Sequence, residues 1–171
     1  MHLPLEAAER HTLSVIVDNE SGILARVAGL FSSRGYNIES LTVADVSGDS
    51  ALSRITIVTS GSPYVIEQII AQLDRLVPVH KVTDLTAYGP HVERELALVK
   101  VGGTGEHRIE AMRLAEIYRA RVLDATIGSF VFEITGSSDK IDTFIALMRE
   151  VGLIEVARTG VAAIARGREA V

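Results

Sequence analysis

Residues 12–46 read TLSVIVDNESGILARVAGLFSSRGYNIESLTVADV, and this stretch decides the fold. Apolar and polar side chains alternate at its start, where Leu13, Val15 and Val17 share one face, which is typical of a strand. The apolar residues that follow recur at helical spacing and predict an amphipathic helix: Ile23, Val27, Leu30 and Phe31. Gly35 predicts the end of that helix, because glycine readily takes the left-handed backbone of a helix C-terminus.

The rest of the first half completes a β-α-β-β-α-β order. A turn rich in glycine and serine is expected at residues 47–51, and Pro63 opens a second amphipathic helix. The remaining strands are expected at residues 37–46, 52–60 and 79–88. This order predicts a ferredoxin-like sandwich, in which one mostly antiparallel sheet carries both helices on one face.

The second half repeats this order after residues 89–91, which indicates two units of the same kind. Its helices are expected at about 108–120 and around 141–148, and its strands at 95–101, 121–127, 129–135, 153–160 and 161–167. We therefore predict an α+β chain of two tandem ferredoxin-like units. The predicted divisions are an N-terminal tail (1–10), a first domain (11–88) and a second domain (92–171).

The composition limits the function classes. Of the 171 residues, 47% are hydrophobic and 23% are charged, which is a globular balance. The mean hydropathy of +0.27 is high, yet no apolar run approaches the ~18 residues of a membrane helix. We therefore expect no membrane partner, and expect the extra apolar surface to lie in the interface of a homo-oligomer. The net charge of −5 disfavours a nucleic-acid partner.

The absence of cysteine excludes disulfides and thiolate chemistry. The N-terminal sequence MHLPLEAAERH lacks the basic and apolar regions of a secretion signal, and it is acidic where a transit peptide would be rich in arginine and serine. We therefore expect a cytoplasmic protein.

The sequence carries no catalytic or metal-binding pattern. It has no phosphate loop, zinc-protease motif or dinucleotide fingerprint. The stretch VGGTGEH at 101–107 lacks the lysine of a nucleotide site and is interpreted as a flexible loop. The five histidines are scattered without ligand spacing, and no serine or aspartate is arranged with a base. We expect neither catalytic residues nor a bound metal.

The polar junction between the first strand and the first helix is the candidate binding site. Gly22 permits close backbone approach, and the amides of Gly22, Ile23 and Leu24 have no acceptor within the helix. These amides suit an anion, and the lack of a lysine or nucleotide motif favours a carboxylate. Asn37 would add a donor and an acceptor, and Ile38 an apolar wall. A small apolar amino acid needs this combination.

An ordinary helix start explains the same residues. Asn19 or Ser21 would then cap the helix, Gly22 would be a turn residue, and Asn37 would tolerate a left-handed backbone. Spacing alone favours this interpretation, because caps and turns are far commoner than binding sites.

Longer strings reverse that preference. The stretch HTLSVIVDNESGILARVAGLFSSRGYNIESLTV (11–43) closely resembles the regulatory, or small, subunits of acetolactate synthase, also called acetohydroxyacid synthase. The resemblance continues through HVERELALVKV (91–101), FEITGSSDKIDTFI (132–145) and VARTGVAAIARG (156–167), and so covers nearly the whole chain. The strings NESG, NIESL and VERELAL are specific to this family, beyond the general pattern of ACT domains.

The resemblance implies that the first half is an ACT domain, which senses small ligands such as amino acids, and that the second half is a related ferredoxin-like domain. It implies no active site in this chain. A separate catalytic subunit, which uses thiamine diphosphate, FAD and a magnesium ion, joins pyruvate to pyruvate or 2-oxobutyrate. The small subunit raises that activity and confers feedback inhibition by branched-chain amino acids, most typically valine.

The resemblance also implies the site residues, because family members dimerise through their ACT domains and hold the effector at that interface. Six positions carry over from two protomers: Asn19, Gly22, Ile23 and Leu24 from one, and Asn37 and Ile38 from the other. The second half has no copy of NESG or NIES, so no equivalent site is implied there.

Three other functions are alternatives to this one. A free-standing amino-acid sensor, for example of transcription, would need a DNA-binding segment, which neither the charge nor a helix-turn-helix pattern supports. A small enzyme would need a catalytic set of residues. A structural subunit with no effector site differs from a regulatory one only in ligand binding, which calorimetry can measure.

Overall fold

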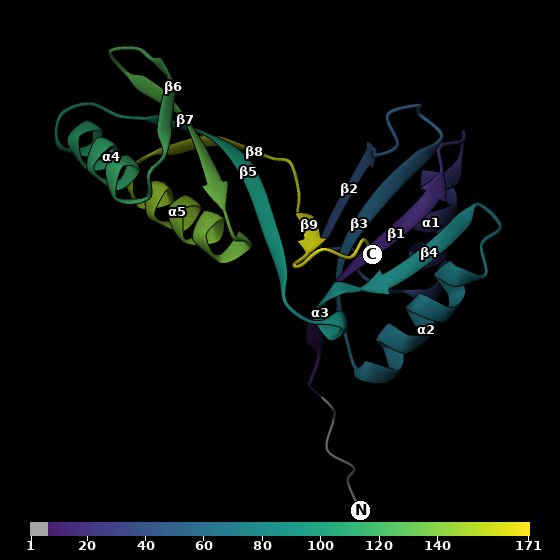
Figure 1. Cartoon of the computed structure of the whole chain (residues 1–171). Coiled ribbons are helices and arrows are strands. Elements are labelled where there is room, and N and C mark those ends of the chain that lie inside the picture. The colour runs from purple at the N-terminus through teal and green to yellow at the C-terminus, as the bar shows by residue number, and fades with distance from the viewer. Residues whose placement is uncertain (1–6) are drawn as a thin grey trace, which may run out of the picture. The chain divides into compact units, whose positions relative to one another are not determined.

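The computed structural model describes residues 7–171, and the chain divides into two compact units. One unit extends to Val92 and also contains Val161–Val171, while Glu93–Gly160 forms the other. Each unit combines two main helices with an antiparallel sheet (Figure 1). The predicted α+β fold of two ferredoxin-like units is therefore confirmed.

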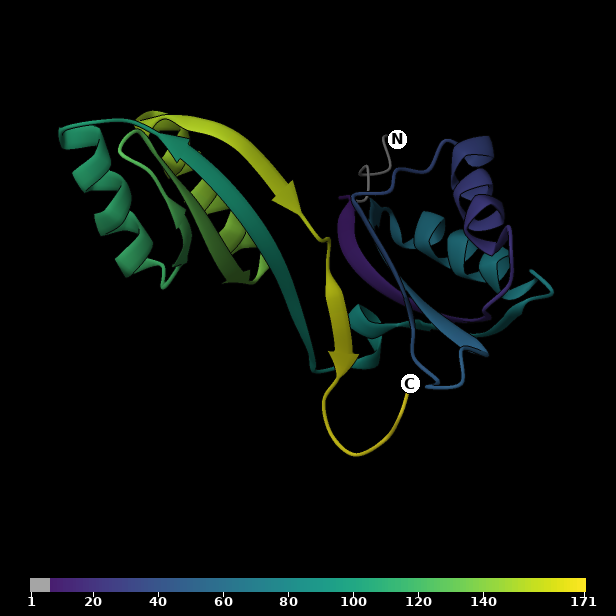
Figure 2. The same ribbon diagram turned by 90° about the horizontal axis from the view of Figure 1, so that it is seen from above.

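The first unit builds its sheet from four strands in the order β2-β3-β1-β4, with all neighbours antiparallel. Its elements are β1 (Glu9–Asp18), α1 (Ile23–Arg34), β2 (Ser40–Asp45), β3 (Leu52–Gly61), α2 (Pro63–Asp74) and β4 (Val79–Asp84). Both helices lie on one face of this sheet (Figure 2), and they bury the apolar strand residues that alternate toward them. That core includes Leu13, Val15, Val17, Ile55, Ile57, Val27, Phe31 and Ile69.

Two strand starts differ from the sequence prediction. β1 begins at Glu9, because Gly61 of β3 still offers it a partner, so the strand takes the last two residues of the predicted tail. Residues 1–6 of that tail lie outside the described residues. β2 begins only at Ser40, so Asn37 and Ile38 precede the strand instead of beginning it.

The last predicted strand of the first unit is shorter than expected. β4 ends at Asp84, whose Oδ1 accepts hydrogen bonds from the backbone N–H groups of Thr86 and Ala87. This aspartate thereby caps a short helix, α3 (Leu85–Tyr88), over residues that were predicted to continue the strand.

The second unit repeats the plan with strand order β6-β7-β5-β8. Its elements are β5 (His91–Gly102), α4 (Glu106–Ile117), β6 (Arg121–Ala125), β7 (Ser129–Gly136), α5 (Ser138–Val151) and β8 (Leu153–Arg158). Aromatic and branched side chains from the sheet pack against both helices, and the largest are Phe130, Phe132, Ile134, Ile141, Phe144 and Met148.

The C-terminal segment covers the face of the first sheet that carries no helix. The backbone N–H of Val161 donates to Ser40 Oγ at 2.8 Å, and Val161 and Ala163 pack against Val58 and Leu85. The Arg54 guanidinium donates to the carbonyls of two residues of this segment. Although the sequence placed residues 161–171 in the second domain, they pack with the first, and β9 (Ala162–Ala165) pairs with β5.

The corresponding face of the second sheet carries charged pairs beside the exposed Leu98. Lys100 and Glu155 form an ion pair of 2.8 Å across β5 and β8, whose hydrogen bond raises the pKa of Lys100 and lowers that of Glu155. Arg121 lies 3.8 Å from Glu133 on the neighbouring strands. Charged pairs thus occupy alternate strand positions on this face. Within residues 7–171, no helix is long and apolar enough to span a membrane.

Candidate functional site

The loop between β1 and α1 depends on a glycine. Gly22 occupies the N-cap position of α1 with φ +85° and ψ −6°, in the left-handed region. An added Cβ at Gly22 would meet no described heavy atom within 4 Å, so backbone conformation, and not crowding, is what requires glycine there. We call residues 19–22 the Gly22 loop.

The helix that follows this loop starts without a cap. Ser62 caps α2 by accepting from the Val65 N–H, and Ser137 caps α5 by accepting from the Lys140 N–H. Among the described residues, no side chain caps α1, and the Ile23 N–H makes only a long contact of 3.5 Å with the Glu20 carbonyl. The interpretation of Asn19 or Ser21 as a cap is therefore wrong, and first-turn amides remain available as donors.

Asn19 fixes the position of the loop. Its side-chain Nδ2 donates to the Ser50 carbonyl at 3.0 Å, and its backbone N–H donates to the Ala51 carbonyl at 2.9 Å. Asp18, just before it, lies 2.6 Å from the His80 ring at the start of β4. The loop is thus held from both sides, by the β2–β3 hairpin and by β4, which keeps the first-turn amides in place without using them.

Ile23 and Leu24 contribute different groups. The Ile23 side chain is buried in the core beside Val27, so this residue offers only its backbone amide at the surface. The Leu24 side chain is 43% exposed, which places an apolar group beside the amides of the first turn. Amides next to an exposed aliphatic side chain suit a ligand that carries both a carboxylate and an apolar group.

Asn37 and Ile38 lie beyond the other end of α1. Gly35 ends the helix with φ +69°, as predicted, and the exposed Asn37 follows, with its carbonyl accepting from Thr59 Oγ1 at 2.6 Å. Ile38 is partly buried against the core. Since α1 has 12 residues, it separates these two residues from Gly22 by roughly 18 Å along its axis. A single chain therefore does not bring the two halves of the predicted site together.

Two other sequence features were considered as sites above: the glycine-rich stretch 101–107 and the histidines. The stretch 101–107 runs from the end of β5 to the start of α4, and only residues 103–105 form the turn between them, with Gly105 at φ +60°. In the part of the chain that the structure describes, no three histidine, cysteine, aspartate or glutamate residues gather in a way that could hold a metal.

Sequence reasoning missed a buried ion pair in the second unit. Glu95 is only 5% exposed, and Arg158 Nη2 donates to its Oε2 at 3.0 Å while Nε donates to its Oε1. Hydrogen bonding to Glu95 raises the pKa of Arg158 far above its ordinary value. Ser138 also donates to Glu95, and Asp142 accepts from Arg158. Glu95 and Arg158 are 63 positions apart, so no local pattern signals the pair.

Two family models match this chain, one in each half. The model of the AHAS small subunit-like ACT domain matches residues 13–81. The model described as the small subunit of acetolactate synthase matches residues 94–167. Together the two models leave only short stretches of the chain unmatched.

Individual relatives agree over nearly their full length. The probable acetolactate synthase small subunit of Archaeoglobus fulgidus is 49% identical over 160 residues, which cover 94% of this chain and 99% of the relative. The acetolactate synthase isozyme 3 small subunit of Escherichia coli is 50% identical over 159 residues, with 92% and 96% covered. The crystal structure of the acetolactate synthase small subunit from Thermotoga maritima superposes with a TM-score of 0.82 at 38% identity, with 94% and 99% covered.

Proposed function

Since this chain belongs to the family of acetolactate synthase small subunits, we propose that it makes the catalytic subunit sensitive to valine or another branched-chain amino acid. The effector binds between the Gly22 loop of one protomer and Asn37 and Ile38 of a second. In this proposal the chain also activates the catalytic subunit, which alone holds thiamine diphosphate, FAD and magnesium, and the complex works in the cytoplasm.

The observation that carries the proposal is the uncapped start of α1. A helix N-terminus with free amides and a favourable dipole attracts a carboxylate, and here the exposed Leu24 side chain lies beside those amides. Asn19 secures the loop through the hairpin, so the amides need little reordering when a ligand arrives.

The separation of the two residue groups supports a site shared by two chains. About 18 Å of helix lies between Gly22 and Asn37, which exceeds the reach of one amino acid. A second protomer would supply Asn37 for the ammonium group and Ile38 for the aliphatic side chain.

Such a bridging ligand can regulate by linkage. Valine lowers activity only if it binds more tightly to the arrangement of protomers that disfavours catalysis. A tenfold preference corresponds to about 1.4 kcal/mol, which one or two charge-assisted hydrogen bonds can supply.

The test combines calorimetry with reconstitution. We expect wild-type chain to bind valine, leucine or isoleucine and to transfer that sensitivity to purified catalytic subunit. Asn37→Ala should abolish inhibition and spare activation, because the exposed Asn37 side chain makes no hydrogen bond within residues 7–171.

Ser32→Ala is the matched control, since Ser32 is exposed near the end of the same helix. It should leave both properties unchanged. Normal valine binding by Asn37→Ala would show that the proposed site is wrong, and failure of the wild-type chain to bind any of the three amino acids would favour a purely structural subunit.

A further inference from the structure

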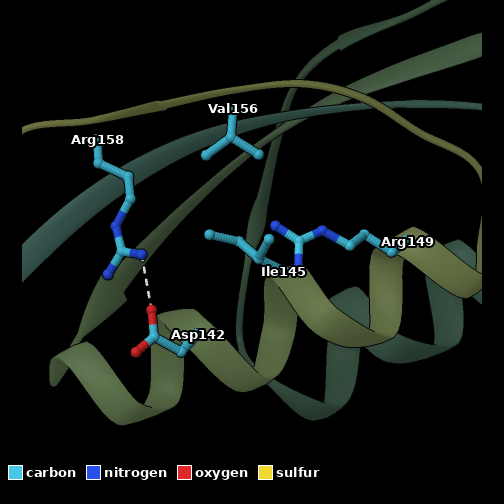
Figure 3. A pocket seen from close by; sticks show the side chains of 5 residues that line it. All are labelled: Asp142, Ile145, Arg149, Val156 and Arg158. Atoms are coloured by element: carbon cyan, nitrogen blue, oxygen red, sulfur yellow. Dashed lines mark hydrogen bonds and ion pairs between the residues drawn. The ribbon is translucent and has the colours of Figure 1, made fainter.

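A groove in the second unit runs between α5 and the edge strand β8. Its volume is about 570 Å³, and five side chains line it: Asp142, Ile145 and Arg149 from α5, with Val156 and Arg158 from β8 (Figure 3). None of these residues belongs to the Gly22 loop or to the six effector positions that the family resemblance implies. We call it the α5–β8 groove.

One end of the groove carries an uncompensated positive charge. Arg149 is exposed, and within residues 7–171 it makes no hydrogen bond or ion pair. Although Arg149 lies in the last turn of α5, its side chain runs back along the helix toward Ile145 instead of toward the helix C-terminus (Figure 3). The guanidinium is therefore free to bind a carboxylate from the groove.

The other end carries a net negative charge. The Arg158 guanidinium donates to both Asp142 and Glu95, so one cation faces two carboxylates. Glu95 is buried and fully occupied by Arg158 and Ser138. The Asp142 side chain is 59% exposed and uses Oδ1 for its 2.6 Å bond to Arg158, which leaves Oδ2 available to a ligand.

An apolar strip separates the two charges. Ile145 is almost completely buried and Val156 partly buried, and both line the groove between Asp142 and Arg149 (Figure 3). Asp142 and Arg149 are seven residues apart on one helix, roughly 10 Å along its axis, and the returning Arg149 side chain shortens the gap. The groove thus presents an acceptor, an aliphatic surface and a cation in sequence.

We propose that the α5–β8 groove binds a small aliphatic α-amino acid. Arg149 binds the carboxylate, Asp142 Oδ2 accepts from the ammonium group, and Ile145 and Val156 contact the side chain. This is a second amino-acid site, independent of the Gly22 loop, and it gives the second unit a ligand of its own.

Methyl NMR on the full chain locates the ligand directly. With labelled isoleucine, leucine and valine methyl groups, addition of unlabelled valine or leucine should shift the signals of Ile145 and Val156 in a saturable way. Two analogues test the charges: 3-methyl-2-oxobutanoate lacks the ammonium group, and isobutylamine lacks the carboxylate. Both should bind roughly tenfold or more weakly, because each forfeits a charge-assisted hydrogen bond.

Two variants complete the experiment. Arg149→Met should weaken binding at Ile145 and Val156 by about tenfold or more, through loss of the carboxylate partner. Arg113→Met is the control, because among the described residues Arg113 pairs with Glu110 alone, on the exposed side of α4, and its substitution should change nothing at the groove.

The outcomes separate this site from the Gly22 loop, whose own reporters are Ile23 and Leu24. Shifts confined to those two residues would refute the groove site and leave the proposed function intact. Shifts at Ile145 and Val156 alone would support the groove site and count against the Gly22 loop. A response at the groove that requires the catalytic subunit and no free amino acid would overturn the proposal in favour of a protein-docking groove.

Discussion

The two units start their first helices after glycines of different backbone conformation, with ψ −6° at Gly22 and ψ −130° at Gly105, and with different chemistry. Both α1 and α4 follow a glycine of positive φ, Gly22 and Gly105, and within the described chain neither helix has a side-chain cap. The first turn of α4 contains Glu106, whereas the first turn of α1 contains no acid and exposes Leu24. An incoming carboxylate would meet a like charge at α4 and an apolar neighbour at α1. Repetition of the fold therefore does not repeat the site.

The units also place a polar side-chain pair at the same structural position, with the acidic and basic partners exchanged between the strands. In the first unit, His11 Nδ1 lies 2.7 Å from Asp84 Oδ2, two residues before Leu13, which faces Asp84 across the sheet. In the second, Glu95 binds Arg158, two residues before Ala97, which faces Arg158. In both units a side chain of the first strand therefore binds a side chain of the last strand, but the residue types of the two partners differ between the units.

The largest expected effect comes from breaking the buried pair of the second unit. Arg158→Met should lower the free energy of unfolding by about 3 kcal/mol, because Glu95 is left buried and without its cation. Denaturant titration measures this change. Arg121→Met is the control, since its ion pair of 3.8 Å with Glu133 is exposed and should cost less than about 0.5 kcal/mol. Equal losses of stability in Arg158→Met and Arg121→Met would contradict the burial of the Glu95–Arg158 pair.

The next effect tests the two glycine loops against each other. Gly22→Asp should weaken valine binding by roughly 30-fold or more, about 2 kcal/mol, because it adds a negative charge beside the amides that would bind the carboxylate. Gly105→Asp should leave valine affinity unchanged. Calorimetry measures the valine affinity of both variants. As a control, Gly22→Asn should retain most of the affinity, because asparagine tolerates this backbone and adds no charge. Equal losses of valine affinity in Gly22→Asp and Gly105→Asp would show that the two glycine loops do not differ as binding sites.

The His11–Asp84 pair predicts a smaller loss of stability in the first unit. His11→Leu should cost about 1 to 2 kcal/mol, less than Arg158→Met, because Asp84 keeps its hydrogen bonds to the backbone of α3 after the histidine is removed. The same denaturant titration gives this value. A loss of stability as large as that of Arg158→Met would mean that the hydrogen bonds from the α3 backbone do not compensate Asp84 for the missing histidine.

The smallest effects concern the helix starts. Ser62→Ala should lower stability by about 1 kcal/mol, since Ser62 caps α2, whereas Ser21→Ala should change it little, since Ser21 does not cap α1. Thermal unfolding of both variants measures the difference. Comparable losses would show that Ser21 caps α1 in solution, and would weaken the case for free amides at the Gly22 loop.

Much of the fold follows from periodic patterns. The apolar spacing of Ile23, Val27 and Phe31 predicted α1, and the alternation of Leu13, Val15 and Val17 predicted β1, because a buried face imposes its period on the side chains. The residues after Asp84 misled the prediction, since a single carboxylate that caps a turn overrides a strand-like composition. The glycine and helix start of the candidate site were also predictable, but the assignment of Gly22 and Asn37 to two different protomers came only from the family resemblance.

By itself, the sequence determined the element order, the duplicated βαββαβ plan and the family to which the chain belongs. These properties are local or repeat along the chain, so they can be read without knowing which segments meet. Only the tertiary structure decided that residues 161–171 complete the first unit and that Glu95 meets Arg158. The physical reason is that such contacts depend on how sheets and helices pack, and the partners share no local signal along the chain.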